Sequence, residues 1–120
     1  MTLNRGNLGF VTQIGAGVTS AVYTVGSAQT AYIKSVLVYN LSTSGTQNVA
    51  IHVVANSGGS AGTASSTTRI ARIGISTDDT FFFEPAYPIT LRSTGDTLQV
   101  YNEGLTSNSI NVLVLGDKEV

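Results

Sequence analysis

The chain has 120 residues and a formal net charge of −1, with one His, no Cys, six basic and seven acidic side chains. Disulfides and thiolate metal sites are therefore excluded, and the groups that carry most acid–base and nucleophilic catalysis are scarce. The chain contains no block of basic residues, which argues against a nucleic-acid partner. Its length suits one domain.

The N-terminal segment, residues 1–14, is polar at its start and lacks the apolar stretch of a secretory signal. Its large apolar residues include Leu3, Leu8 and Phe10 among Asn, Gly and Arg. We expect this segment to form an N-terminal arm or a first strand, and residues 15–120 to form a single β-sandwich domain. No later run of about 18 apolar residues predicts a membrane helix, so we expect a protein made and kept in a cytoplasm.

Period-two runs rich in Val, Ile, Tyr and Thr alternate with clusters of Gly, Ser, Asn and Asp, a pattern typical of short antiparallel strands. No stretch has a helical period. The runs predict an all-β fold of about eight strands, arranged as an antiparallel β-sandwich or a jelly roll. In chain order the candidate strands are 10–14, 21–25, 31–40, 48–55, 69–75, 80–84, 89–92, 97–101 and 109–115.

Some of these runs carry apolar residues on both faces of the expected strand. In the run 31–40, Val36 and Val38 occupy even positions, while Leu37 and Tyr39 occupy odd positions. One apolar face is enough to build a core, so the second exceeds what a water-facing surface needs. This pattern predicts that part of the second face contacts another subunit.

The longest stretch without a strand pattern is 56–68, which contains the run Ser-Gly-Gly-Ser-Ala-Gly. Such a composition is typical of a linker. We expect it to form a mobile surface loop or a hairpin tip.

Most residues that could carry chemistry are better explained by structure. His52 lies mid-strand with no second His, whereas a zinc site needs three or four ligands. Asp78 and Asp79 lack the regular acidic spacing of a calcium loop and indicate a turn. Gly15 and Gly17 lack the helix and the Lys of a phosphate-binding loop, so they also indicate a turn.

Three cations, Lys34, Arg69 and Arg72, could form a basic spot for an acidic partner, although solvated strand ends explain them as well. A Ser nucleophile is unsupported, because the chain has one His and no Gly-x-Ser-x-Gly motif. We therefore predict no catalytic residue, no metal site and no cofactor, and a protein that is not an enzyme.

The aromatic residues give a clue to an interface. Phe81, Phe82 and Phe83 are consecutive, so in a strand Phe82 faces opposite to its two neighbours. At least one of these rings must then be covered by a loop, a second sheet or a neighbouring subunit. The Tyr residues could likewise form a platform for sugars or anchor an interface; they are Tyr23, Tyr32, Tyr39, Tyr87 and Tyr101.

The order of strands and turns over roughly residues 20–116 carries a family resemblance. Its most distinctive parts are Ile33-Lys34-Ser35-Val36, in a strand that ends at Asn40, and the turn Gly95-Asp96-Thr97-Leu98. With these features the chain resembles small all-β virion proteins of tailed bacteriophages. It departs from that pattern in the consecutive Phe residues 81–83.

The resemblance implies a non-enzymatic structural role, since such proteins commonly decorate or cement the capsid, frequently as trimers, or build head fibres or tail parts. We therefore expect a homotrimer that binds the major capsid protein on the capsid surface of the virion, with neither nucleic acid nor membrane as a partner. The alternative is a carbohydrate-binding or adhesin-like module whose exposed Tyr rings stack on sugars. The contact residues expected for the first function are Leu3, Leu8, Phe10, Tyr32, Val36, Val38 and Phe82.

Overall fold

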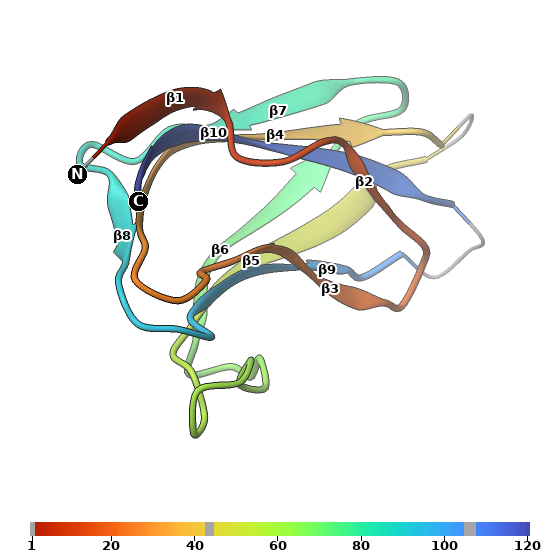
Figure 1. The fold of residues 1–120 in the computed structure, drawn as a ribbon. Coiled ribbons are helices and arrows are strands. Elements are labelled where there is room, and N and C mark those ends of the chain that lie inside the picture. Colours follow the sequence, from red (N-terminus) through yellow and green to blue (C-terminus); the bar gives the residue numbers. More distant parts are fainter. Residues whose placement is uncertain (1, 43–44, 105–107) are drawn as a thin grey trace.

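The computed structural model describes residues 2–42, 45–104 and 108–120, and the regular structure of these residues is entirely β. Within these described residues, ten strands form two antiparallel sheets that pack face to face (Figure 1). The all-β sandwich predicted from the sequence is confirmed. The strands are β1 (Leu3–Asn7), β2 (Thr12–Ile14), β3 (Thr19–Thr24), β4 (Thr30–Asn40), β5 (Gln47–Val54), β6 (Arg69–Ile75), β7 (Thr80–Phe83), β8 (Ile89–Leu91), β9 (Thr97–Asn102) and β10 (Ile110–Glu119).

The strand order is that of a jelly roll. Sheet A has the order β1-β10-β4-β7, with β2 also paired to β10 and β8 also paired to β4; sheet B has the order β3-β9-β5-β6. Short strands β1 and β2 share one edge of β10, and β7 and β8 share one edge of β4, so sheet A is four strands wide. In both sheets, strands from the first half of the chain alternate with strands from the second half.

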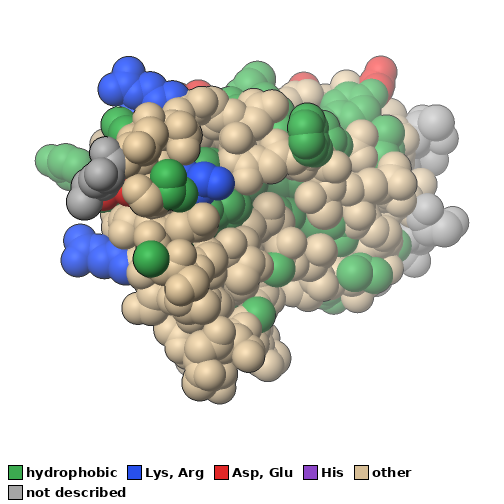
Figure 2. Space-filling view, in the orientation of Figure 1, with side chains coloured by type: hydrophobic (Ala, Val, Ile, Leu, Met, Phe, Trp, Pro, Cys, Tyr) green, Lys and Arg blue, Asp and Glu red, His purple; other side chains and the backbone are tan. Residues whose placement is uncertain are grey.

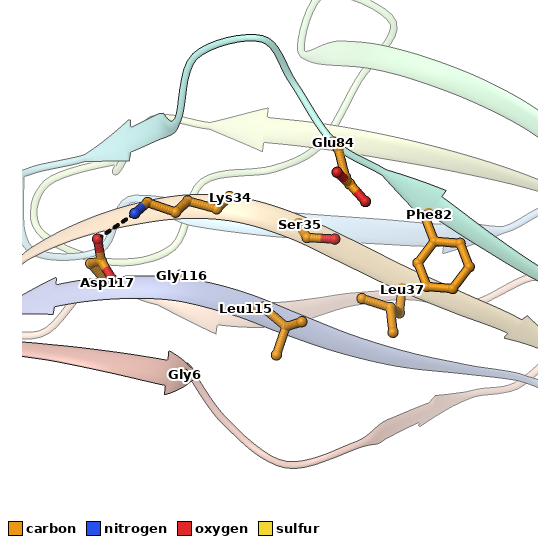
Figure 3. Close-up of a pocket in the computed structure, with 9 residues that line it drawn as sticks. All are labelled: Gly6, Lys34, Ser35, Leu37, Phe82, Glu84, Leu115, Gly116 and Asp117. Carbon is orange, nitrogen blue, oxygen red and sulfur yellow. Dashed lines mark ion pairs between the residues drawn. The ribbon is translucent and has the colours of Figure 1, made fainter.

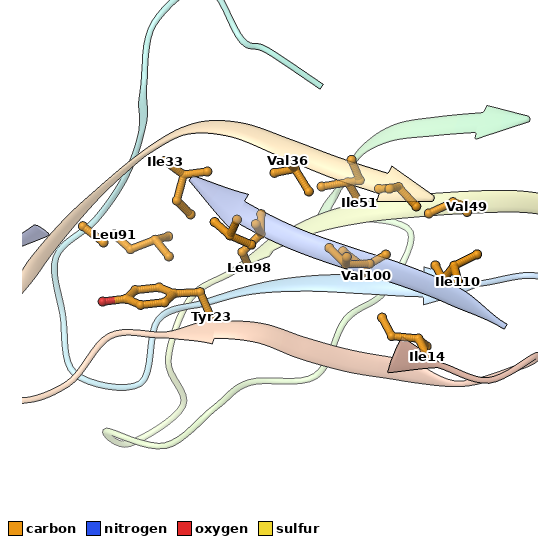
Figure 4. Packing of buried hydrophobic residues seen from close by; sticks show 14 of the residues in the cluster. Ile14, Tyr23, Ile33, Val36, Val49, Ile51, Leu91, Leu98, Val100 and Ile110 are labelled. Atoms are coloured by element: carbon orange, nitrogen blue, oxygen red, sulfur yellow. The ribbon is translucent and has the colours of Figure 1, made fainter. Parts of the chain in front are cut away.

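The core lies between the two sheets and is almost entirely aliphatic. Alternate residues of each strand point inward, as the period of two requires, and Figure 4 shows Ile33 and Val36 of sheet A near Ile51 and Val100 of sheet B. The largest fully buried side chains are Ile14, Ile33, Ile51, Leu91, Leu98 and Ile110. These residues fix which face of every strand remains for other contacts.

A β-bulge at Lys34 changes which residues of β4, odd-numbered or even-numbered, face the core. Leu115 of β10 pairs with Ser35, whereas the next residue, Gly116, pairs with Ile33, so Lys34 has no partner in this ladder. An unpaired residue in one strand moves every later side chain to the opposite face. Inward-facing residues of β4 are therefore odd-numbered before the bulge and even-numbered after it.

The bulge corrects two of the predicted contact residues. The sequence places Tyr32, Val36 and Val38 on one face because all three are even-numbered. In the structure Val36 and Val38 are fully buried in the core and cannot form a subunit surface in this fold. Tyr32 and Leu37 remain on the outer side of sheet A, where both are half-buried.

The segment 1–14, predicted as an arm or a first strand, contributes β1 and β2 to sheet A, with residues 8–11 as the connection between them. Both strands are hydrogen-bonded to β10, and β1 pairs with it from Leu3 opposite Glu119 to Asn7 opposite Leu115. All five residues of β1 are exposed. Its attachment to the sandwich therefore comes mainly from backbone hydrogen bonds at the edge of sheet A.

One end of the sandwich is closed by three buried amide side chains. Asn40 Nδ2 donates to the carbonyl of Ile75 at 2.9 Å. Gln47 Nε2 donates to Asn102 Oδ1 at 3.0 Å, and Asn102 Nδ2 donates to the carbonyl of Ile14 at 3.1 Å. Because buried polar groups are costly unless they are hydrogen-bonded, this network both satisfies the amides and joins the ends of five strands.

The loop between β5 and β6, residues 55–68, projects from the sandwich beside sheet B (Figure 1). It was expected as a surface loop, and most of its side chains are exposed. It is nevertheless tied to the sheet, because Gln99 Nε2 donates to the carbonyl of Gly62 at 3.0 Å and Asn56 N donates to Asp96 Oδ1 at 2.9 Å. Under this loop the outward-facing side chains His52, Thr97 and Gln99 are buried.

Candidate functional site

A row of large apolar side chains crosses the outer face of sheet A. Leu37 of β4 pairs with Phe82 of β7 on one side and with Leu113 of β10 on the other. Phe82 is 58% exposed. We call the surface formed by this row and its neighbours the outer apolar face; its residues are Val11, Leu37, Tyr39, Phe82, Leu113 and Leu115.

Two hollows lie on the outer apolar face and share Leu37. The larger, with a volume of about 500 Å³, is lined by Leu37, Leu115 and Phe82 and ends at Lys34 and Asp117, as Figure 3 shows. The second has a volume of about 260 Å³. Together they make an uneven apolar surface that protruding side chains of another molecule could enter.

Two ion pairs lie at one end of the outer apolar face. Lys34 Nζ lies 2.7 Å from Asp117 Oδ2 (Figure 3), and Arg5 Nε of β1 lies 3.8 Å from Asp117 Oδ1. The Asp117 side chain is largely buried, whereas Lys34 and Arg5 are mostly exposed. The two cations therefore balance the negative charge of the Asp117 carboxylate.

Two tyrosine hydroxyls donate to carboxylates near the same face. Tyr32 donates to Glu119 Oε1 at 3.1 Å, and Tyr39 donates to Asp78 Oδ1. Each hydrogen bond holds the proton on the phenol and so raises the pKa of its tyrosine, with burial adding to the effect. Both rings are fixed on the outside of sheet A and present no ionised group to a partner near neutral pH.

The other predicted contact residues are dispersed. Phe10 is 92% exposed in the connection between β1 and β2, and Leu3 of β1 is 45% exposed. Leu8 instead packs partly against the core. Val11, which is 58% exposed, was not among the predicted contact residues, although it lies within the candidate strand 10–14.

The orientation predicted for the three consecutive Phe residues is confirmed. Phe81 and Phe83 pack against the core, and Phe82 faces outward. Among the Tyr residues, Tyr23 is buried in the core, so it cannot contact a sugar. Tyr87, by contrast, is 85% exposed.

The remaining candidate residues serve the turns. Asp79 Oδ1 accepts a hydrogen bond from Thr80 N at 2.9 Å. Gly17 adopts a φ of +74°, which favours glycine, and its N–H donates to the carbonyl of Asn102 at 2.7 Å. Both observations fit the turn interpretation of these motifs.

The three cations considered for a basic spot are not assembled into one. Lys34 lies on β4 of sheet A and pairs with Asp117. Arg69 and Arg72 lie on β6 of sheet B, and Arg72 Nε pairs with Glu103 Oε2 at 2.9 Å. Two of the three charges are thus matched by different carboxylates, Asp117 on β10 and Glu103 just after β9.

Charged groups are sparse on the side of the molecule shown in Figure 2, where uncharged polar atoms and scattered apolar side chains dominate. Within residues 2–42, 45–104 and 108–120, no group of three or more His, Asp or Glu side chains is placed to hold a metal ion. The same residues include no helix that is long and apolar enough to cross a bilayer.

No protein-family model and no curated protein matches the chain. Among solved structures, the chain is similar to a protein from the Bacillus endospore appendages, which are described as a novel family of disulfide-linked pili. The TM-score is 0.46 and the identity 16%, over 99% of this chain and 87% of that chain. The present chain has no Cys.

The chain is also similar to proteins in two structures of infectious bursal disease virus. For the Gt strain the TM-score is 0.33 and the identity 8%, over 98% of this chain and 32% of that chain. For the Gx strain the TM-score is 0.39 and the identity 11%, over 98% of this chain and 31% of that chain. The chain therefore spans about a third of the length of these viral chains.

Proposed function

We propose that the protein is a non-enzymatic structural component of a tailed-phage virion: a homotrimer that binds the major capsid protein on the capsid surface and strengthens the head shell. The observation that carries the proposal is the outer apolar face, a row of large apolar side chains on the outside of a fold whose core is complete without it. Apolar patches on a protein surface mark sites of association when they are large. The sequence resemblance to small phage virion proteins indicates the kind of assembly.

The outer apolar face is assigned to the contact between subunits. A standard interface covers about 800 Å² on each partner, against a surface of 6327 Å² for this chain. The row Phe82–Leu37–Leu113, extended by Leu115 and Val11, crosses sheet A from β7 to the connection before β2. A protruding aromatic ring beside hollows is the usual form of an interface anchor.

The connection that carries Phe10, with the neighbouring β1 that carries Leu3, is assigned to the capsid. Both residues lie at the edge of sheet A, and Phe10 is almost fully exposed. Each such contact is small, but a trimer presents three of them at once. Effective concentration then converts weak individual contacts into a stable attachment.

The oligomer is tested with Phe82→Asp, which places a charge in the apolar row without opening the core. Light scattering after size exclusion is expected to give the mass of a trimer for the wild type and of a monomer for the variant, because an unpaired buried charge is costly. Ile70→Asp is the matched control, since Ile70 is an exposed apolar residue of sheet B. A wild-type monomer at all concentrations would contradict the assignment.

The capsid contact is tested by co-sedimentation with expanded, undecorated capsids. Wild type is expected to pellet with the capsids, and Phe10→Asp is expected to stay in the supernatant while remaining trimeric. This variant separates the two surfaces, because it leaves the outer apolar face unchanged. If the wild-type protein stays in the supernatant, the decoration role is wrong even where the trimer is observed.

A further inference from the structure

A small polar pocket lies on the outer face of sheet B, opposite the outer apolar face. Its floor is built from neighbouring strands: Thr19 of β3 pairs with Tyr101 of β9, and His52 of β5 pairs with Arg69 of β6. Residues 64–66 of the β5–β6 loop form its wall. The pocket has a volume of about 240 Å³, below the roughly 300 Å³ at which sites for drug-sized ligands begin. One sugar ring or another small molecule is therefore the largest suitable occupant.

The polar side chains of the pocket are largely unused by the protein itself. In the described part of the chain, the side chains of Thr19, Ser66, Arg69 and Tyr101 make no hydrogen bond or ion pair. Arg72, three residues after Arg69 on the same strand, is instead paired with Glu103. Arg69 is thus an unneutralised cation at the pocket, and no acidic residue lines it.

His52 supplies a neutral group at the floor. Thr68 Oγ1 lies 3.0 Å from His52 Nδ1 and donates its own proton to the carbonyl of Ser65 at 3.0 Å. In the tautomer that matches this donation by Thr68, Nδ1 carries the ring proton and Nε2 is free to accept a hydrogen bond. Burial lowers the pKa of His52, and the charge of Arg69 adds to this effect, so the imidazole is uncharged near neutral pH.

We propose that this pocket binds a sugar residue that carries a carboxylate, such as a uronic acid within a glycan. The Arg69 guanidinium matches a carboxylate in geometry and charge. Hydroxyl groups of Thr19, Ser66 and Tyr101, together with Nε2 of His52, can donate to and accept from sugar hydroxyls. The Tyr101 ring adds an apolar surface against which a sugar face can pack.

The balance of groups favours an acidic sugar over a phosphate or a neutral sugar. A phosphate carries up to two charges and usually meets several cations or backbone N–H groups, whereas this pocket offers one cation among neutral polar groups. A neutral sugar would leave the guanidinium without its partner. The inference does not rest on the proposed assembly, because the pocket and the outer apolar face lie on opposite sheets.

The test is a titration of the ¹⁵N-labelled protein with D-glucuronate, D-glucose and acetate, followed by amide chemical shifts. Glucuronate is expected to give saturable shifts at Thr19, His52, Ser66, Arg69 and Tyr101. Glucose lacks the carboxylate and so loses a hydrogen bond to a charged group, while acetate lacks the sugar hydroxyls and so loses several neutral hydrogen bonds. Each loss is expected to weaken binding by at least about tenfold.

Arg69→Gln is expected to weaken glucuronate binding by about tenfold or more while the spectrum of the free protein keeps its dispersion. Arg72→Gln is the matched control and is expected to leave binding unchanged, because the charge it removes already has a carboxylate partner. Absence of saturable shifts with glucuronate, equal affinity for acetate, or equal losses in the two variants would each overturn the proposal. The same titration is repeated with Phe82→Asp, the variant expected to be monomeric. Unchanged glucuronate binding there shows that the pocket works whether or not the subunits associate.

Discussion

At the scale of single residues, Asp96 is the most connected carboxylate in the described chain. Its Oδ1 accepts hydrogen bonds from the backbone and side-chain nitrogens of Asn56, at 2.9 and 3.0 Å, and its Oδ2 accepts from Ser93 N at 3.0 Å. Burial by itself raises the pKa of Asp96, but these hydrogen bonds outweigh it and hold the pKa below its ordinary value of 3.8. One ionised side chain thus ties the turn before β9 to the β5–β6 loop.

This linkage predicts an acid-sensitive contribution to stability. Because the pKa is lower in the folded protein than in the unfolded chain, the contribution is present above about pH 4 and is lost as the pH falls through the lower, folded value. Asp96→Asn should therefore lower the free energy of unfolding at neutral pH and reduce its dependence on pH below about pH 4. Urea unfolding at a series of pH values measures both; parallel profiles for the two proteins would contradict the prediction.

Gly116 is required by the bulge that reverses β4. A Cβ atom at this position would overlap the backbone carbonyl of Tyr32, and backbone atoms cannot move aside as a flexible side chain can. Gly116→Ala is expected to lower the free energy of unfolding by about 2 kcal/mol, the usual cost of overpacking. In Gly9→Ala the new Cβ meets nothing, so this control should unfold within about 1 kcal/mol of wild type in denaturant titrations.

At the scale of the elements, sequence reasoning located the strands more reliably than it assigned their faces. Of the ten strands in the described residues, all except β1 overlap a candidate run, because turn residues and period-two patterns are local signals. The bulge at Lys34 is not local: it depends on the approach of Gly116 from β10. Because all three residues are even-numbered, the sequence pattern placed Tyr32 on the same strand face as Val36 and Val38. Only Tyr32 lies on the outside.

The reversed parity predicts opposite outcomes at adjacent positions of β4. Val36→Ala removes buried methyl groups and is expected to lower the free energy of unfolding by about 2 kcal/mol. Leu37→Ala truncates a side chain on the outer apolar face, so the unfolding of the isolated subunit should change by less than about 1 kcal/mol. Chemical denaturation at low protein concentration compares the two. A larger loss for Leu37→Ala would mean that the faces of β4 have been assigned the wrong way round.

At the scale of the whole molecule, the sequence predicted either an antiparallel β-sandwich or a jelly roll, without deciding between the two strand orders. Local patterns do not specify which strands pair across the chain, and every sheet neighbour of β9 and β10 comes from an earlier part of the sequence. The same limit applies to the candidate sites. Phe82 was found because alternation forces it outward, whereas the pocket around His52 was missed because the loop that walls it gives no periodic signal.

The near-neutral surface predicts how association responds to salt. With a net charge of −1 and an apolar contact face, the oligomer mass should change little between about 50 mM and about 500 mM NaCl, where charge-driven contacts are screened. Sulfate, which is excluded from protein surfaces, should strengthen association. Sedimentation equilibrium in the two salts measures both effects. Dissociation by NaCl would point to the ion pairs around Asp117 as the contact.

The buried amides at one end of the sandwich have a consequence for how the molecule comes apart. The hydrogen bonds of Asn40, Gln47 and Asn102 do not depend on the ionisation of a side chain, because amides do not titrate in the accessible range. The opposite end, where β9 begins, depends on the ionised carboxylate of Asp96. We therefore expect acid to weaken the two ends unequally: amide hydrogen exchange at falling pH should lose protection around the β5–β6 loop before it does at the amide end.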